Sequence, residues 1–505
     1  MTINVPSVNI TGITGNLITC ECTVTTGIGV HIVGLSDETM KETLLRVVTA
    51  LQSVGYHIPG KKITVNLPTG VNHNGIDLPI AISILGASAQ EPFDQEELNR
   101  WIIFGELGLD GSVRDVQGAL QAIQEAVKYN KKGIILPTQS AFQIVEYIDD
   151  IPIYGVDNLE QAKDIILGDG TPSVQELLYQ NQKGTLPQTN QKTWDAIFGN
   201  EGAKRAIEIA AAGGHNILLT GKAGGVQSAL AHGMRQMLPQ MPKEEILTNA
   251  LILSSRSIYL QNASRRPLIN IYASASLSSF TGTTQKGIVE PGAFSLANNG
   301  ILTIEDIDKL PKSVTEMLKN VMEDKRVVFS TLKSTVTIPA EFQLLAEMEP
   351  CPCGNLGTKK CTCTPEQKKA WWDRIIKNPV YDRIDIQALV NPEPANGPMA
   401  HGELIQEPAK RVAAAIAVQE RRFAGTTIRR NADMRQKDID KYCPLSDTCK
   451  QILEKLTERL GLSVRAYTKI LLIARTIADL DSKKDIEPAH IAEAASMRFM
   501  DRSNP

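Results

Sequence analysis

The sequence predicts a multidomain α/β protein in which two α/β domains are followed by a helical domain. Three observations support this class. Short β-like runs alternate with helical runs from residue 3 to about 167, a strand, a Gly-rich loop and a helix follow one another over 215–237, and Ala-rich and Leu-rich helical segments fill the chain from about 403. A length of 505 residues also fits about three domains.

The domain boundaries follow from changes of composition along the chain. The first α/β domain covers 1–167, with strands expected at 17–24, 31–33 and 62–66 and a helix over 37–54. Residues 168–193 are rich in Gly, Thr, Pro and Gln and form the predicted linker. The second α/β domain covers 194–395, with a Cys-rich insert at 351–363, and the helical domain covers 403–505, with breaks at Pro444 and Gly461.

The chain carries no signal for export or membrane insertion. Its start lacks a basic segment followed by an apolar stretch, and no run approaches the roughly 18 apolar residues of a membrane span. We therefore expect a cytoplasmic protein without membrane contact. The net charge of -3 gives no overall attraction to DNA, so DNA contact would need local patches such as Arg421–Arg422 and Arg429–Arg430. Such pairs equally suit the polar face of a helix.

The loop at 221–228 has the context of a phosphate-binding loop but not its full motif. A buried strand is predicted before it and a helix after it, the order in which backbone N–H groups and a helix N-terminus cradle phosphate. The motif requires Gly at 226 and Lys at 227, where this chain has Val226 and Gln227. A β-branched Val restricts the backbone that must approach the phosphates, and neutral Gln cannot supply a charge-assisted contact of about 1.5–3 kcal/mol.

Other parts of the loop are retained. Gly221, Gly224 and Gly225 keep the backbone adaptable, and Ser228 keeps the hydroxyl that would reach Mg²⁺. The loop is therefore predicted to bind ATP and Mg²⁺ weakly or not at all. The alternative is an ordinary Gly-rich turn without a ligand.

An acidic pair ends the next predicted buried strand. Residues 300–304 are followed by Glu305 and Asp306, where a P-loop ATPase places Asp and then Glu to hold Mg²⁺ and polarise the attacking water. The order is reversed here. Glu305 can still reach a metal, but Asp306 is one methylene shorter than a Glu base, and a misplacement of about 1 Å can lower the rate about 100-fold. A solvated acidic loop is the alternative.

Five collinear segments resemble the ComM/YifB group of magnesium-chelatase-like AAA+ proteins, and the resemblance spans essentially the whole chain. The segments are 198–216, 291–300, 349–354, 382–385 and 463–467. The resemblance implies an N-terminal Lon-peptidase-like α/β domain, a AAA+ P-loop α/β core and a C-terminal helical lid. It also implies a hexameric ring that uses ATP to act as a DNA helicase in branch migration.

The resemblance assigns roles to further residues. It makes Arg465 the sensor-2 arginine at the nucleotide phosphates, and Arg383 or Arg374 the arginine finger that reaches a neighbouring subunit's site. The sensor-1 position holds Glu349 in place of Asn, and a carboxylate there repels the γ-phosphate. Tyr272 and Ala273 stand where the family has two histidines. The degenerate loop, the reversed acidic pair and the acidic sensor therefore converge on one pocket.

The N-terminal domain shows a parallel loss. Residues 77–81 and 104–113 resemble the stretches of Lon that carry its Ser-Lys dyad, and the resemblance puts Ile80 at the serine and Leu120 at the lysine. Neither side chain can attack a peptide bond or accept a proton, so we expect no peptidase activity.

Four of the eight cysteines form one cluster. They are Cys351, Cys353, Cys361 and Cys363. Four thiols on a short loop can close a tetrahedral Zn²⁺ site with Zn–S distances of about 2.3 Å, and the site would be structural because no open position is evident. The Cys-x-Cys spacing is tighter than the usual Cys-x-x-Cys, so four reduced thiols packing a loop remain the alternative.

Three functions are compatible with these features. The first is a ring-forming pseudo-ATPase with a structural or regulatory role in DNA processing, assembled as a hexamer with itself or with an intact paralogue. The second is an active DNA motor in which Arg465 or Lys222 replaces the lost lysine. The third is a nucleotide-independent DNA-binding module. The convergence of the departures on one pocket favours the first.

Overall fold

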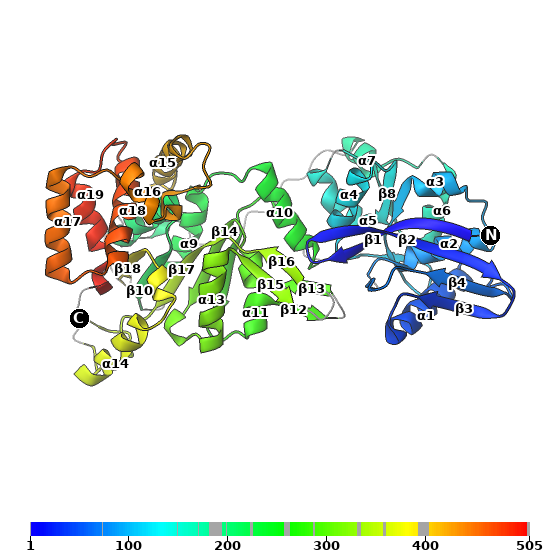
Figure 1. Ribbon diagram of the computed structural model, residues 1–505, viewed down its shortest axis with the longest axis horizontal. Helices are drawn as coiled ribbons and strands as arrows, with labels where there is room; N and C mark the ends of the chain where they lie inside the picture. The colour runs from blue at the N-terminus through cyan, green and yellow to red at the C-terminus, as the bar shows by residue number, and fades with distance from the viewer. Residues whose placement is uncertain are drawn as a thin grey trace.

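The computed structural model describes residues 2–72, 74–148, 150–169, 171–180, 194–197, 199–222, 226–256, 263–285, 288–330, 335–356, 360–391 and 403–501. The molecule is elongated, with an N-terminal α/β unit at one end, a second α/β unit in the middle and the C-terminal helices at the other end (Figure 1). It is thus a mixed α/β protein, as the sequence predicts. Among the described residues, no helix combines the length and apolar character needed to span a bilayer.

The N-terminal unit is built on two sheets and a short hairpin. One sheet has the order β1-β2-β4-β3, from β1 (Thr2–Thr11), β2 (Thr14–Thr25), β4 (Lys62–Asn66) and β3 (Gly29–Val33). The other is parallel, with β8 (Gly133–Pro137) between β5 (Trp101–Ile103) and β9 (Ile153–Val156). The hairpin pairs β6 (Glu106–Leu107) with β7 (Val113–Arg114). The strand expected at 62–66 matches β4.

The helices of this unit are α1 (Asp37–Ser53), α2 (Asp77–Ala87), α3 (Gln95–Asn99), α4 (Ala119–Lys128), α5 (Thr138–Ile144), α6 (Leu159–Leu167) and α7 (Val174–Gln180). Helix α1 matches the helix expected over 37–54. Helix α7 lies inside the predicted linker and packs on β9, because Val174 is buried and the Gln175 side chain bonds the backbone of Ile151 and Ile153. Residues 181–193 of that linker lie outside the described residues.

The middle unit is a five-stranded parallel sheet of order β11-β14-β17-β10-β18. Its strands are β11 (Leu268–Tyr272), β14 (Gly300–Glu305), β17 (Phe342–Met348), β10 (Ile217–Gly221) and β18 (Ile386–Val390). The inner strands are mostly apolar, as in parallel sheets covered on both faces. Since all five strands run the same way, their carboxyl ends meet at one edge of the sheet and their amino ends at the other. We call these the carboxyl edge and the amino edge.

The helices of the middle unit are α8 (Glu201–Gly213), α9 (Val226–Met237), α10 (Lys243–Ser254), α11 (Leu277–Thr281), α12 (Ala293–Leu296), α13 (Lys312–Asp324) and α14 (Pro365–Ile376). Two hairpins project from it, β12 (Gly282–Gln285) with β13 (Ile288–Pro291) and β15 (Arg326–Ser330) with β16 (Thr335–Pro339). Helix α10 packs on α4 of the N-terminal unit, where the Gln121 Nε2 donates to the carbonyl oxygen of Leu251 over 2.9 Å.

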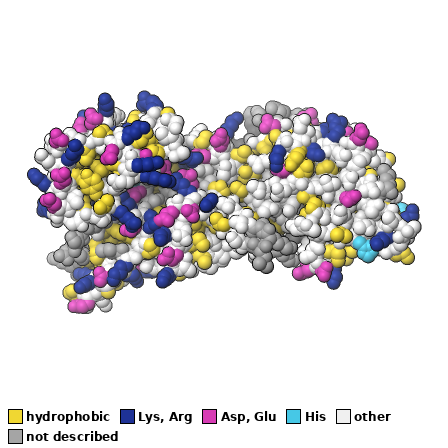
Figure 2. All heavy atoms as spheres, viewed as in Figure 1, with side chains coloured by type: hydrophobic (Ala, Val, Ile, Leu, Met, Phe, Trp, Pro, Cys, Tyr) yellow, Lys and Arg dark blue, Asp and Glu magenta, His cyan; other side chains and the backbone are white. Residues whose placement is uncertain are grey.

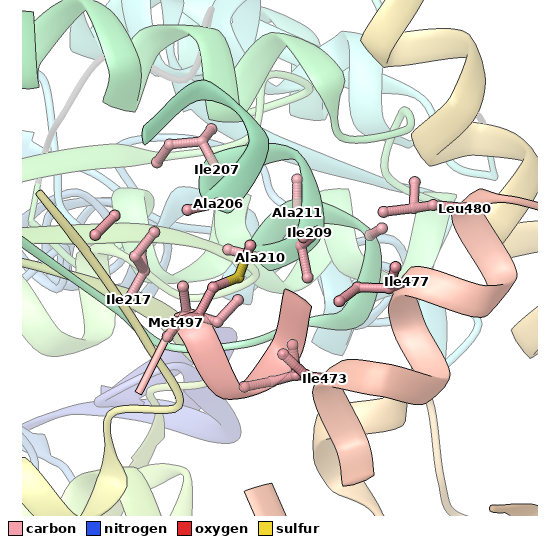
Figure 3. Close-up of a cluster of buried hydrophobic side chains, with 14 of the residues drawn as sticks. Ala206, Ile207, Ile209, Ala210, Ala211, Ile217, Ile473, Ile477, Leu480 and Met497 are labelled. Atoms are coloured by element: carbon pink, nitrogen blue, oxygen red, sulfur yellow. The ribbon is translucent and has the colours of Figure 1, made fainter. Parts of the chain in front are cut away.

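The C-terminal part of the described chain is helical. Its helices are α15 (Gln406–Arg422), α16 (Gln436–Tyr442), α17 (Asp447–Leu460), α18 (Val464–Leu480) and α19 (Pro488–Ser496). Ala206, Ile207 and Ala210 of α8 meet Ile473 and Ile477 of α18 in one buried apolar cluster (Figure 3). This cluster fixes the helical domain on the middle unit.

Candidate functional site

The described residues of the Gly-rich loop, 221–222 and 226–228, lie at the carboxyl edge of the sheet, where β10 ends and α9 begins. Gln227, at the position of the motif lysine, is 5 % exposed, and its Nε2 donates to the carbonyl oxygen of Lys222 over 3.2 Å. Val226 is buried, whereas Lys222 and Ser228 are exposed. The amide group at the position of the lysine therefore forms a hydrogen bond within the loop itself.

Of the three glycines in the loop, Gly221 is the one that the structure describes. A Cβ on Gly221 would lie 2.4 Å from the carbonyl oxygen of Val390, so the close approach of β18 already requires glycine there. Gly224 and Gly225 lie outside the described residues. Gly221 therefore has a packing role that is independent of phosphate.

Carboxylates gather at the same edge. Glu305, the last residue of β14, accepts a hydrogen bond from the Asn270 Nδ2 over 2.9 Å. Asp306 has a positive φ of 56° and pairs with Lys309 at 3.0 Å. Glu347 of β17 is opposite Leu219 of β10, between the loop and the acidic pair. Burial, together with the charges of Glu305 and Asp306, raises the pKa of Glu347 from 4.5 to about 8.

Sequence reasoning missed Glu347 and Asn270. The signal for Glu347 is one acidic residue inside the apolar run of β17, LLAEM. Glu349, predicted at the sensor position, follows β17, and a Cβ on Gly354 would lie 3.2 Å from its Oε1. Its carboxylate therefore lies against the turn that carries the first two cysteines.

The two predicted phosphate-contacting arginines lie at the amino edge. Arg383, just before β18, donates from its Nη1 to the carbonyl oxygen of Pro379 over 2.8 Å and pairs with Glu323. Arg465, at the start of α18, is 71 % exposed and pairs with Asp382. Burial and the nearby Arg465 lower the pKa of Arg383.

The residues predicted for one nucleotide site thus form two groups at opposite edges of the sheet. Both arginines line a cavity of about 1050 Å³ between the middle unit and the helical domain. Arg374, the other candidate arginine finger, lies on α14 and bonds Asp308 over 2.8 Å, two residues beyond Asp306. At the carboxyl edge, Gln227 occupies the position of the motif lysine, and Glu305, Asp306 and Glu347 lie near the ends of β14 and β17.

Comparison with known proteins decides the family. Family models match residues 193–397 (magnesium chelatase, subunit ChlI), 402–498 (its C-terminal part) and 20–140 (subunit ChlI of Mg-chelatase). The chain is 34% identical over 501 residues to the YifB protein of Salmonella typhimurium, covering 97% of this chain and 96% of the relative. It is 33% identical over 505 residues to the competence protein ComM of Haemophilus influenzae, with the same shares covered. The chain belongs to the ComM/YifB family of magnesium-chelatase-like AAA+ proteins.

This member of the ComM/YifB family also resembles a peptidase over a limited stretch. It is 29% identical over 129 residues to Lon protease 2 of Bacillus subtilis, which is 25% of this chain. Ile80 and Leu120, the residues predicted at the dyad positions, are each 0 % exposed and belong to two different apolar clusters. Both therefore act as core residues.

The four clustered cysteines converge. Their sulfur atoms all lie within 4.8 Å of one another, with 3.4 Å between Cys351 and Cys353 and 3.7 Å between Cys353 and Cys361. A tetrahedral ion with four Zn–S bonds of about 2.3 Å has S···S edges of about 3.8 Å. The Cys353 sulfur accepts hydrogen bonds from the backbone N–H groups of Thr362 and Asn355, which lower the pKa of Cys353. The four thiols can together hold a metal ion.

Most of the basic side chains considered for DNA contact form ion pairs with acidic side chains of the same chain. Arg422 pairs with the fully buried Asp479. Arg429 lies 3.5 Å from Glu245, and Arg430 lies 3.7 Å from Glu420. Arg421 is exposed and bonds a carbonyl oxygen of its own helix. On the face seen in Figure 2, basic side chains are mixed with acidic ones over the middle unit and the helical domain.

Proposed function

We propose that this chain is a ring-forming AAA+ subunit that hydrolyses ATP weakly or not at all and has a structural or regulatory role in DNA processing. The observation that carries the proposal is Gln227, a buried amide bonded to the loop carbonyl at the position of the phosphate-binding lysine. Without that lysine, the loop lacks a charge-assisted contact of about 1.5–3 kcal/mol to the triphosphate.

The electrostatics of the carboxyl edge support the same proposal. Glu305, Asp306 and Glu347 are close enough to one another for the pair to raise the pKa of Glu347. Bringing a triphosphate to this edge adds negative charge beside groups that already repel each other. Lys309 forms an ion pair with Asp306. Among the described residues of the loop, Lys222 is the exposed cation.

The amino edge supports a role for the chain in a neighbour's reaction. Arg383 and Arg465 are retained and lie together, on the side of the sheet opposite to the chain's own loop. In a ring, such a pair would serve as the arginine finger and the sensor-2 arginine of the adjacent subunit. The neighbour would be a second copy in a hexamer, or an intact paralogue whose own loop keeps its lysine.

A DNA partner is proposed from the relation to ComM and YifB. Of the four arginines considered for this contact, only Arg421 has no acidic partner within 4 Å in the described residues. We therefore expect DNA contact to depend on ring assembly more than on the surface of one subunit. Binding of branched DNA to the single subunit and to the assembled ring, measured at low and high salt, tests this.

The ion proposed for the four cysteines is Zn²⁺ in a structural role. Thiolates favour soft or borderline ions, and a closed set of four leaves no position for substrate. Metal content per chain, measured after purification under reducing conditions, tests this part of the proposal.

Restoring the loop tests the central claim. The double variant V226G/Q227K should bind Mg-ATP about 10- to 150-fold more tightly than the wild type, which corresponds to the 1.5–3 kcal/mol of the missing contact. Gln236→Lys adds the same charge at an exposed position of α9 and should change affinity little. Tight binding and turnover by the wild type, abolished by Lys222→Ala, would instead establish the active motor in which Lys222 replaces the lysine.

Subunit mixing tests the role of the two arginines. The substitutions V226G/Q227K and R383A/R465A are introduced together into one chain. This subunit has the restored phosphate-binding loop but lacks both arginines. Turnover should appear when this subunit is mixed with the wild type, which has the arginines, and not when it is mixed with R383A/R465A alone. If the loop-restored variant keeps full turnover after losing both arginines, they do not act on a neighbour's nucleotide.

A further inference from the structure

The cysteine cluster lies between two elements of the middle unit, β17 and α14. Cys351 follows the end of β17 by three residues, and Cys363 directly precedes Thr364, the N-cap of α14. Metal bonds to all four thiols would therefore fasten the carboxyl end of β17 to the first turn of α14. A tie of this kind restricts the whole segment between the two elements.

Helix α14 is poorly held by packing alone. Most of its residues from Pro365 to Ala370 are exposed, and its apolar contacts with the core are those of Trp371, Trp372 and Ile375 in its second half. The helix projects from the body of the molecule (Figure 1). A helix of 12 residues is marginal in water without such support, so the cap at Thr364 and the cysteine cluster must hold its start.

The same helix supplies a cation to the carboxyl edge. Arg374 of α14 bonds Asp308, whose side chain is 7 % exposed and whose other carboxylate oxygen, Oδ1, has no hydrogen-bond partner in the described residues. Asp308 is two residues from Asp306 and belongs to the segment that links β14 to α13. Without Arg374, a largely buried carboxylate next to the acidic pair would lose its charge partner, which is unfavourable.

We propose that a thiophilic divalent ion of the Zn²⁺ class, bound by Cys351, Cys353, Cys361 and Cys363, acts as a clip that docks α14 and thereby places Arg374 on Asp308. The metal then controls the acidic edge from a distance, without touching it. This inference rests on the proposed Zn²⁺ site. Loss of the ion should free α14 and loosen the segment from Asp306 to Lys309.

Gly354 connects the cluster to the sensor position as well. Its backbone N–H donates to the carbonyl oxygen of Cys351 over 2.9 Å, and its φ of 71° lies in the left-handed region that favours glycine. A Cβ here would also press on the Glu349 carboxylate at 3.2 Å. The turn that carries Cys351 and Cys353 therefore also packs against the carboxylate of Glu349.

The experiment compares the metal-loaded full chain with the same chain after chelation under reducing conditions, and then after adding back Zn²⁺. We expect one Zn²⁺ per chain, and at least a tenfold faster amide hydrogen exchange in 365–376 and 306–309 after chelation, reversed by Zn²⁺. The Trp371–Trp372 pair, with ring centroids 6.1 Å apart, gives a second signal in the tryptophan emission. Cys361→Ser should mimic chelation.

Two further variants separate the steps. Arg374→Ala should keep Zn²⁺ and the protection of α14 but speed exchange in 306–309. Cys449→Ser, at a buried cysteine of the helical domain, should change neither metal content nor exchange in α14. Absence of bound Zn²⁺ would remove the metal site and this inference with it. One Zn²⁺ per chain with exchange in 365–376 unchanged by chelation would leave the site standing and overturn the clip.

Discussion

Replacing Glu347 by Gln should stabilise the protein, and increasingly so as the pH rises. The carboxyl group has its pKa raised from 4.5 to about 8, chiefly by burial and then by Glu305 and Asp306. In the unfolded chain the group is ionised above about pH 4.5, whereas in the folded chain it keeps its proton up to about pH 8. The folded state therefore binds one more proton in this window, and its stability falls as the pH increases.

The magnitude follows from the same difference in pKa. At 1.36 kcal/mol per pKa unit, keeping Glu347 protonated in the folded state costs at most about 4 kcal/mol of stability at pH 7.5. Because the side chain is only partly buried, water screens some of this penalty, and we expect about 1–3 kcal/mol. Glu347→Gln removes the charge and keeps the shape of the side chain.

The assay is urea unfolding of wild type and Glu347→Gln at pH 5, 6, 7 and 8. The difference in the free energy of unfolding should be near zero at pH 5 and grow toward pH 8. Glu454→Gln, which removes an exposed carboxylate on α17, is the matched control and should give no such trend. A difference that is constant with pH, or that shrinks toward pH 8, would refute the claim that Glu347 is held protonated beside the acidic pair.

Two further predictions concern the domains on either side. Arg422→Ala should destabilise the helical domain by about 3–5 kcal/mol in thermal or urea unfolding, because it deprives the fully buried Asp479 of one of its two arginines; an effect below about 1 kcal/mol would contradict this. Leu120→Lys should lower stability and yield no peptidase activity on a casein substrate, because residue 120 is 0 % exposed in an apolar cluster; a stable variant would show that the site tolerates the charge.

The elements around the loop could be predicted from the sequence because local patterns determine them. A short apolar run followed by glycines gives β10 and the loop, and the apolar run at 300–304 places Glu305 at the end of β14. The cysteine cluster was predictable for the same reason, since its spacing is local. Helix α7 was not, because only the contact of Val174 with β9 distinguishes it from the polar linker around it.

Features that depend on the order of the strands in the sheet could not be predicted from the sequence. Glu347 becomes a neighbour of the acidic pair only because β17 lies between β10 and β14. Arg383 and Arg465 carry no local signal of the edge they occupy, and their separation from the loop follows from β18 lying parallel to β10. Ion pairs between distant residues are also not visible in the sequence, which does not show that Arg422 pairs with Asp479.

The two edges of the core differ in charge, and this contrast limits what the protein can do. At the carboxyl edge, Gln227 offers no positive charge, and Glu305, Asp306 and Glu347 lie close together. At the amino edge, Arg383 and Arg465 remain within reach of each other's charge. If both edges served only packing, R383A/R465A would affect stability alone; if they serve a neighbour, the same variant would lower turnover in mixed rings and leave the fold of its own subunit intact.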